Sequence, residues 1–197
     1  GENPASSTIL DAAGTGRTLT ITANALAELF SVRITGGKVL NDSGAGILAG
    51  SSDLRLTNCA VVNNEAGYGG GGVYTQGPVR LTKSIVSDNK ANYGGGIYLF
   101  GNVSSFITDS VISGNRSTNF QGDGGGGMLS SQSAVTIVGT EISGNMAAQG
   151  GGGIQTYQGI ITLNAACRLL NNSVSLFGPG AIYAIAPGSV AVNGATV

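Results

Sequence analysis

The sequence predicts an all-β fold, a parallel β-helix (β-solenoid) of about six to seven coils with three short strands in each. Three observations support this prediction: a unit that repeats along almost the whole chain, apolar residues that alternate with polar ones inside each unit, and glycine clusters between units. A fixed repeat of 20–50 residues is typical of solenoids, and alternation with a period of two is typical of β-strands. Short segments so rich in glycine do not favour helices.

The repeat is defined by an apolar residue after each glycine cluster and by an asparagine that closes each unit. A pair of alternating apolar residues, a small residue and a branched aliphatic residue recur between them in the same order. The last complete unit fits only with one extra residue near 164–166. The apolar residues are Ile47, Val73, Ile97, Met128, Ile154 and Ile182. The closing asparagines, at steps of 25, 26, 30 and 27 residues, are Asn64, Asn89, Asn115, Asn145 and Asn172.

Stacking of the coils explains these residue choices, because equivalent residues of neighbouring coils then lie about 4.8 Å apart. We expect the aliphatic columns to fill the interior, and the asparagines to form a ladder in which each side-chain amide bonds the next. Glycine suits the other turn because it adopts positive φ without a clash. Cys59 and Cys167 share the small-residue column four coils apart, a distance of about 19 Å, so we expect two buried free thiols and no disulfide.

One stretch of the repeat has a specific resemblance. Gly-Gly-Gly-Ile-Tyr at 94–98 is followed by a strand and by Ser-Val-Ile-Ser-Gly-Asn at 110–115. This order resembles the repeats of bacterial cell-surface proteins such as polymorphic outer-membrane proteins and autotransporter passengers, within the pectate-lyase-like superfamily. The resemblance covers roughly residues 8–197 and implies a right-handed parallel β-helix. It is specific for the fold and carries little information about function.

Composition narrows the class of protein. The 197 residues suit one domain, which we place at 8–197 after an extended N-terminal arm at 1–7. Hydrophobic residues make up 41% of the chain and charged residues only 10%, with a net charge of −1. We expect no nucleic-acid partner, because there is no basic patch, and no membrane span, because no apolar run approaches 18 residues. Low charge and Gly/Ser/Thr tracts indicate an extracellular or cell-surface protein whose leader has been removed.

Two segments depart from the regular repeat. Residues 18–22 alternate as a strand, which we align with the Leu54/Leu56 column, and residues 23–30 fit either a short helix or a bulged loop and strand. Residues 116–123 lengthen one unit, so we expect a loop pushed out of a turn. Inserted loops of solenoids often lie on the binding face, but the sequence favours a tolerated surface insertion without function.

The ends of the array lack an evident cap, although solenoids usually cover their terminal coils. We therefore expect end-to-end self-association into a homo-oligomer, in which the arm at 1–10 adds a strand to the unfinished last coil of a neighbour. The alternative is an excised fragment of a longer surface protein. The residues expected at these ends are Ile9, Leu10, Val190, Val192 and Val197.

The sequence offers no catalytic, cofactor-binding or metal-binding residues. It contains no histidine, and its ten acidic residues are scattered. A glycosidase needs two carboxylates facing one groove, whereas Asp88 and Asp109 fall on neighbouring coils in different columns. Asp123 sits alone in a glycine run, while calcium-binding solenoids repeat their aspartate in every turn. We therefore expect a protein that is not an enzyme and needs no cofactor.

An outward stripe is the one candidate contact surface, because each member follows an inward aliphatic residue. Such a stripe can hold sugar rings or another copy of the chain, or it can be a simple ladder of like side chains. Gln155 occupies the same rank. The stripe consists of Leu48, Tyr74, Tyr98, Leu129 and Tyr183.

These observations favour a non-enzymatic structural β-solenoid that assembles into a surface filament or acts as an adhesin-type passenger. Its expected partners are other copies of the chain and, for an adhesin, a polysaccharide or a host-cell surface. The alternative is a polysaccharide-binding or pectate-lyase-like carbohydrate-active module.

Overall fold

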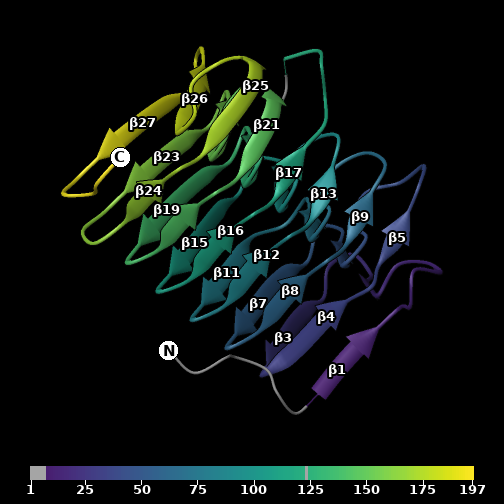
Figure 1. Cartoon of the computed structure of the whole chain (residues 1–197). Helices are drawn as coiled ribbons and strands as arrows, with labels where there is room; N and C mark the ends of the chain where they lie inside the picture. Colours follow the sequence, from purple (N-terminus) through teal and green to yellow (C-terminus); the bar gives the residue numbers. More distant parts are fainter. Residues whose placement is uncertain (1–7, 123) are drawn as a thin grey trace.

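Short parallel strands wind into a stack of coils, with β1 in the first coil and β27 in the last (Figure 1). This computed structural model describes residues 8–122 and 124–197. Within these ranges every regular element is a β-strand, and the strands build four sheets along the sides of the stack. The parallel β-helix that the sequence predicted is therefore confirmed. The predicted number of three strands per coil was too low, since most coils contribute a fourth.

Each sheet takes equivalent strands from successive coils, all paired in parallel. Sheet A contains β1 (Thr8–Asp11), β4 (Val32–Thr35), β8 (Ala60–Val62), β12 (Ile85–Ser87), β16 (Val111–Ser113), β20 (Glu141–Ser143) and β24 (Arg168–Leu170). Sheet B contains β2 (Leu19–Ile21), β6 (Ile47–Ala49), β10 (Val73–Thr75), β14 (Ile97–Phe100), β18 (Met128–Ser131), β22 (Ile154–Tyr157) and β26 (Ile182–Ile185).

The other two sheets complete each coil. Sheet C contains β3 (Leu26–Phe30), β7 (Asp53–Thr57), β11 (Val79–Thr82), β15 (Ser104–Thr108), β19 (Ala134–Val138), β23 (Ile160–Leu163) and β27 (Ser189–Val192). Sheet D contains β5 (Lys38–Val39), β9 (Glu65–Ala66), β13 (Lys90–Ala91), β17 (Arg116–Ser117), β21 (Met146–Gln149) and β25 (Ser173–Phe177). Several strands of sheet D have only two residues, too few to show alternation, which is why the repeat pattern did not reveal this sheet.

The register places like residues above like, and this stacking makes one continuous core. Val86 of β12 pairs with Val61 on one side and Ile112 on the other, and all three side chains are buried. The same holds in sheet B, where Val73 lies between Ile47 and Ile97. Burial of these columns removes apolar surface from water at about 25 cal/mol per Å², which is the main stabilising contribution to the stack.

The first coil differs from the prediction. The strand expected at 18–22 exists as β2, but it belongs to sheet B, where Leu19 pairs with Ile47. The Leu54/Leu56 column is continued instead by Ala27 and Leu29 of β3. Residues 23–30 therefore form a loop and a strand, and the helix interpretation is wrong. Pairing along β7 supplies the backbone hydrogen bonds that so short a helix would have to make alone.

The turn before sheet D explains the Ser-Gly-Asn ending of the repeat. The residue before each ladder asparagine has positive φ, a conformation that glycine, asparagine and aspartate adopt most readily. The next residue then points inward, where the asparagine side chain bonds its counterpart one coil away. Gly37 takes the equivalent place in the first coil, and its N–H donates to Asn64 Oδ1 at 2.9 Å. The positive-φ residues are Gly36, Asn63, Asp88, Gly114, Gly144 and Asn171.

Candidate binding face

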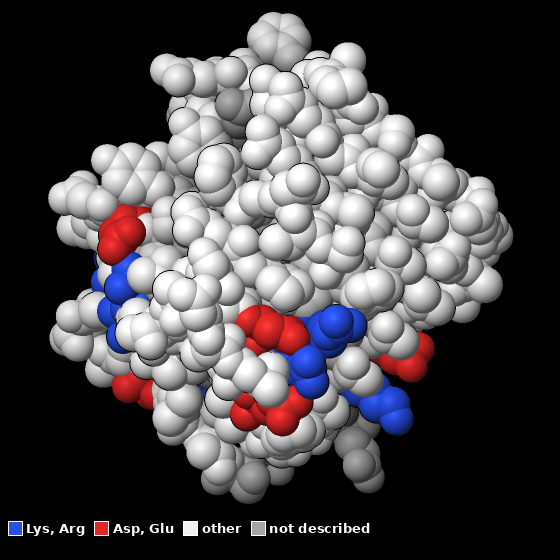
Figure 2. All heavy atoms as spheres, turned by 180° about the vertical axis from the view of Figure 1, so that it is seen from behind, with Lys and Arg blue, Asp and Glu red and all other residues white. Residues whose placement is uncertain are grey.

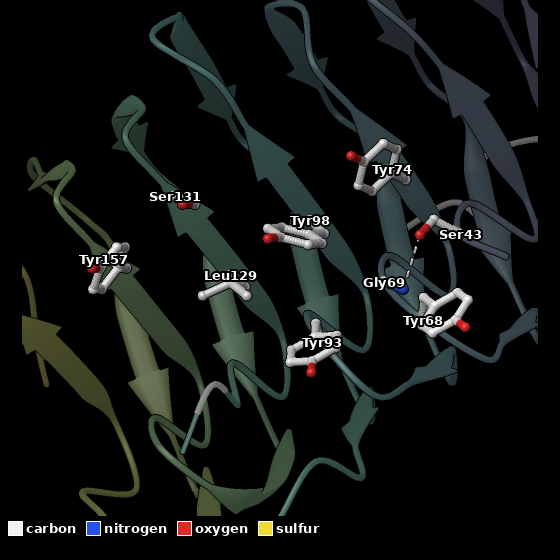
Figure 3. A pocket seen from close by; sticks show the side chains of 9 residues that line it. All are labelled: Ser43, Tyr68, Gly69, Tyr74, Tyr93, Tyr98, Leu129, Ser131 and Tyr157. Carbon is white, nitrogen blue, oxygen red and sulfur yellow. Dashed lines mark hydrogen bonds between the residues drawn. The ribbon is translucent and has the colours of Figure 1, made fainter. Parts of the chain in front are cut away.

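A groove of about 520 Å³ crosses the outer face of sheet B (Figure 3). Its side chains come from β10, β14, β18 and β22 and from the turns before β6, β10 and β14. The groove therefore runs across the strands, along the axis of the stack. Its lining residues are Ser43, Tyr68, Gly69, Tyr74, Tyr93, Tyr98, Leu129, Ser131 and Tyr157.

Strand alternation places the strand tyrosines on this face. In β14, Ile97 and Leu99 are buried in the core, and Tyr98 and Phe100 therefore point outward. Tyr74 stands between the buried Val73 and Thr75 of β10 in the same way. Tyr68 and Tyr93 approach from the turns before these strands (Figure 3).

Tyr98 is the centre of an aromatic cluster. Its ring centroid lies 5.4 Å from that of Tyr74 at an interplanar angle of 82°, and 6.1 Å from that of Phe100 at 75°. Tyr93 lies 6.4 Å away with its ring tilted by 38°. Edge-to-face contacts of this kind are favourable, so each ring restricts the motion of its neighbours.

Gly69 makes room for this cluster. A Cβ at Gly69 would lie 2.3 Å from Cδ1 of Tyr98, so any side chain there would displace the ring. The Gly69 N–H donates to Ser43 Oγ at 3.1 Å (Figure 3). This hydrogen bond joins the turn before β10 to the turn before β6. Glycine is needed at position 69 for the close approach of an aromatic ring, because the positive φ of this turn belongs to Gly70.

The predicted stripe lies in one row across sheet B. Tyr74 pairs with Leu48 and Tyr98, Tyr98 with Leu129, and Gln155 stands between Leu129 and Tyr183. Three members, Tyr74, Tyr98 and Leu129, line the groove. Leu48 lies beside them, half-buried in β6. Leu129 and Gln155 are buried, so the stripe is not uniformly exposed.

Tyr183 lines a neighbouring depression of about 430 Å³, together with Phe177 and Tyr157. Tyr157 is shared by this depression and the groove. All six tyrosines of the chain therefore lie on this one face. Tyr157 was missed from the sequence, although the signal was present: it follows the outward Gln155 by two residues, which places it on the same side of the strand.

Every residue that lines the groove is uncharged. One ion pair, Arg17–Asp42, adjoins it at Ser43, whose carbonyl accepts a hydrogen bond from Arg17 Nη2 at 3.1 Å. On sheet C, Arg55 pairs with Glu28 at 3.0 Å and with Asp53 at 2.8 Å. On sheet D, Glu65 lies between Lys38 at 2.9 Å and Lys90 at 2.7 Å. Figure 2 shows such groups as small mixed clusters on a largely uncharged surface.

Asp88 and Asp109 are not brought together as a catalytic pair. Asp88 lies in the turn after sheet A, and Asp109 in the turn after sheet C. Among the described residues, no group of three or more His, Cys, Asp or Glu side chains could hold a metal ion. In the same part of the chain, no helix is long and apolar enough to cross a membrane. Asp123 lies outside the described residues.

The predicted end residues lie in the terminal coils. Ile9 and Leu10 belong to β1, which pairs with β4 of its own chain. Thr8–Leu10 are therefore part of the first coil, and the expectation of a free arm reaching to Leu10 is wrong; residues 1–7 lie outside the described part of the chain. At the other end, Val190 and Val192 pair with Ile161 and Leu163, and Val197 follows a bridge between Arg168 and Thr196. The side chains of Ile9, Val192 and Val197 are exposed.

Comparison with known proteins gives one family. The model of a right-handed β-helix region matches residues 19–197. This agrees with the handedness that the resemblance implied, and the match covers strands β2 to β27. No curated protein and no solved structure matches the chain.

Proposed function

This chain belongs to the right-handed β-helix family, and we propose that it is a non-enzymatic, extracellular adhesin-type β-solenoid that binds a neutral polysaccharide in the groove on sheet B. One observation carries the proposal: five tyrosines line the groove, and none of its lining residues is charged. Sugar rings offer apolar C–H faces for contact with aromatic rings and hydroxyls for contact with tyrosine and serine hydroxyls. Aromatic walls with a few polar groups are typical of such sites.

The aromatic cluster supports binding because it is formed before any ligand arrives. Tyr98 is held by ring contacts with Tyr74, Tyr93 and Phe100. A side chain already fixed in place loses little conformational entropy on binding, so more of the contact energy appears as affinity. The groove also runs along the stack, which suits an extended chain rather than a compact ligand.

Binding without cleavage is the form of the proposal that fits this lining. Hydrolysis of a glycosidic bond needs a carboxylic acid and a carboxylate on either side of the bond. The lining offers tyrosine and serine hydroxyls instead, and no carboxyl group is among its lining residues. A pectate-lyase-like reaction would also need cationic groups near an acidic substrate, and the groove has none among its lining residues.

The test is affinity electrophoresis and calorimetry against soluble neutral glucans, mannans and xylans, with a polyuronate as the acidic comparison. We expect binding to at least one neutral polymer and none to the polyuronate. Tyr98→Ala should lower the affinity about tenfold or more, the loss expected for a central aromatic contact. Phe106→Ala is the matched control, because Phe106 is an exposed aromatic residue on sheet C that packs against Arg80.

Two results would sink the proposal. One is that no neutral polymer binds to the folded wild-type protein. The other is that Phe106→Ala weakens binding as much as Tyr98→Ala. Release of new reducing ends from a bound polymer would point instead to the carbohydrate-active alternative.

End-to-end assembly is a second candidate, favoured by the apolar side chains exposed on both terminal coils, such as Ile9 and Val197. A second copy of the chain would cover them, and so would further coils of a longer chain. Negative-stain electron microscopy of purified protein separates these cases, with Val192→Lys as the variant that places a charge on the last strand of sheet C. Fibres that disappear in Val192→Lys would support assembly, and dispersed wild-type particles would contradict it.

A further inference from the structure

The longest coil carries a loop that is fixed at its first end. The step from Asn115 to Asn145 is 30 residues, and the extra residues follow β17. Thr118 donates from its Oγ1 to Asn92 Oδ1 at 2.7 Å. The next backbone N–H, that of Asn119, donates to the Asn92 carbonyl at 3.2 Å. The loop at 118–122 therefore begins in contact with the turn before β14.

Gln155 fixes the other end of this loop. Its side chain is fully buried, and its Oε1 accepts hydrogen bonds from the N–H groups of Gly124 at 2.9 Å and Gly151 at 3.3 Å. Its Nε2 donates to the Gly122 carbonyl at 3.1 Å. Gly150 leaves the space that this amide occupies, since a Cβ there would lie 1.8 Å from Oε1. A buried amide with these partners is costly to replace.

The loop held in this way forms a depression of about 380 Å³ beside the groove. Phe120 is 68% exposed there, although its backbone is anchored on both sides. Asn119 Nδ2 is buried without a hydrogen-bond partner, which is an unsatisfied donor at the same depression. The lining combines aromatic and neutral polar side chains: Asn92, Tyr93, Thr118, Asn119, Phe120 and Gln121.

Tyr93 joins this depression to the groove, because it lines both. The groove extends over strands from β10 to β22, whereas the depression involves only the turns of two neighbouring coils. The depression therefore lies to one side of the groove and does not extend it along the stack. A linear chain in the groove would pass it, and a substituent on that chain would enter it.

We propose that this depression is a second glycan subsite, which receives a side-branch sugar of the polysaccharide whose main chain lies in the groove. Gln155 is the positioning residue of this subsite, because it holds the loop that presents Phe120. The inference rests on the proposed function and narrows its ligand to branched neutral polysaccharides. Neutral amides and an aromatic ring match the hydroxyls and C–H face of an uncharged sugar.

The binding experiment uses matched pairs of oligosaccharides: a β-1,4-mannan hexamer with and without galactosyl branches, and a β-1,4-glucan hexamer with and without xylosyl branches. We expect one branched member to bind about tenfold more tightly than its linear partner. Phe120→Ala should remove this preference and leave the affinity for the linear member within about twofold. Tyr98→Ala should weaken both members equally.

Gln155→Met tests the positioning role, with Gln76→Met as the same change at an exposed glutamine. Without ligand, amide hydrogen exchange at Gly124 should become faster in Gln155→Met and stay unchanged in Gln76→Met. With ligand, Gln155→Met should lose the branch preference, and the double variant with Phe120→Ala should lose nothing more.

The outcomes separate the two proposals. If the wild type binds no member of either pair, the polysaccharide proposal fails and the subsite fails with it. If linear and branched members bind equally, or Phe120→Ala weakens both, the subsite fails and the groove stands. Unchanged exchange at Gly124 in Gln155→Met, or additive losses in the double variant, would overturn the role of Gln155.

Discussion

The side-chain oxygen of Asn115 accepts two hydrogen bonds from Asn89 of the preceding coil, one from the backbone N–H and one from Nδ2, both at 3.0 Å. Asn115 Nδ2 in turn donates to the Val86 carbonyl at 2.9 Å and to Asn145 Oδ1 at 3.0 Å. Both donor hydrogens and both acceptor positions of the amide are thus used. The same arrangement recurs at Asn89 and Asn145, so each of these three asparagines links three coils.

Replacing Asn115 should be among the most destabilising single changes in the chain. Asn115→Ala leaves the N–H and Nδ2 of Asn89 without their acceptor and the Val86 carbonyl without its donor. Buried unsatisfied groups cost about 1–3 kcal/mol each, so we expect a loss of about 3 kcal/mol or more in the free energy of unfolding, measured with urea. Asn102→Ala, at an exposed asparagine, should change it by less than about 0.5 kcal/mol. A loss below about 1 kcal/mol for Asn115→Ala would contradict this account.

Asn115→Asp should make stability depend on pH in a defined direction. An ionised carboxylate at this position would face two acceptors, the Val86 carbonyl and Asn145 Oδ1, whereas a protonated one can donate to one of them. Burial and these acceptors raise the folded-state pKa of the new carboxyl above its unfolded value of about 3.9. The free energy of unfolding of the variant should therefore be closest to that of the wild type below about pH 4, and it should decrease relative to the wild type as the pH rises. The control is Asn171→Asp, at the exposed residue just before the ladder asparagine Asn172. It should show no such trend in urea unfolding between pH 3 and 7.

A second column of positive-φ residues gives a test of backbone strain. It stands in the turn after sheet C and contains Ser31, Asn58, Lys83, Asp109, Gly139 and Ala166. Lys83 has φ of 49° and an exposed side chain. The left-handed conformation costs a residue with a Cβ about 1–2 kcal/mol, part of which glycine loses again through unfolded-state entropy. We expect Lys83→Gly to stabilise the fold by about 0.5–1 kcal/mol and Gly139→Ala to destabilise it by about 1–2 kcal/mol. Thermal unfolding of both variants checks the signs, and a stabilising Gly139→Ala would refute the argument.

Most of the fold could be predicted from the sequence, because equivalent positions of successive repeat units are also neighbours in space. Each coil lies on the next, so aligning the asparagines also aligns Val61 with Val86 and Ile112. The first coil was misaligned because no glycine triplet precedes residues 18–22, so this strand was not recognised as the one that follows the glycine turn. The true strand of sheet C, β3, lies in a segment whose composition also suits a helix. The two-residue strands of sheet D gave no periodic signal.

The candidate face was only partly predictable. Alternation placed Tyr74 and Tyr98 outward, but it does not report what covers them. Leu129 and Gln155 are buried on that face, and Gln155 holds the loop beside it. Position in a repeat gives a side chain's direction, whereas an inserted loop has no equivalent in the other coils from which its path could be inferred.

The two cysteines should be unreactive in the folded protein. Both are free and buried, and burial raises the pKa of the Cys59 thiol above its ordinary value. The thiolate is the reactive form. Burial therefore opposes modification of both thiols by limiting access, and at Cys59 it also opposes ionisation. We expect a disulfide-exchange reagent at pH 8 to titrate no thiol in the native protein and two after unfolding. Rapid titration of one thiol in the native state would show that its coil opens locally or is less buried than described.

The ion pairs of Glu65 should make the stability of the fold depend on pH and salt in a way that can be assigned to one site. Hydrogen bonds from Lys90 and Lys38 hold its pKa below its usual range, and Glu65 lies between these lysines on neighbouring coils of sheet D. A depressed carboxyl pKa stabilises the fold above the unfolded pKa of about 4.3, and this contribution disappears as the pH falls through the folded value. All three side chains are partly exposed, so the contribution should be below about 1 kcal/mol and decrease in salt.

Glu65→Gln should therefore lower the free energy of unfolding at pH 7 in low salt. The difference from wild type should shrink as the pH falls through the folded-state pKa of Glu65, and it should disappear in about 1 M salt, where the Debye length falls to about 3 Å. Asp109→Asn removes the same charge from an exposed turn on another side of the stack, which controls for net charge. A difference from wild type that persists at a pH low enough to protonate Glu65 in the folded state would mean that Glu65 acts through packing, because its charge is then absent in both states. Equal effects of the two variants at pH 7 would mean that overall charge, rather than the pairing across β5, β9 and β13, sets the pH dependence.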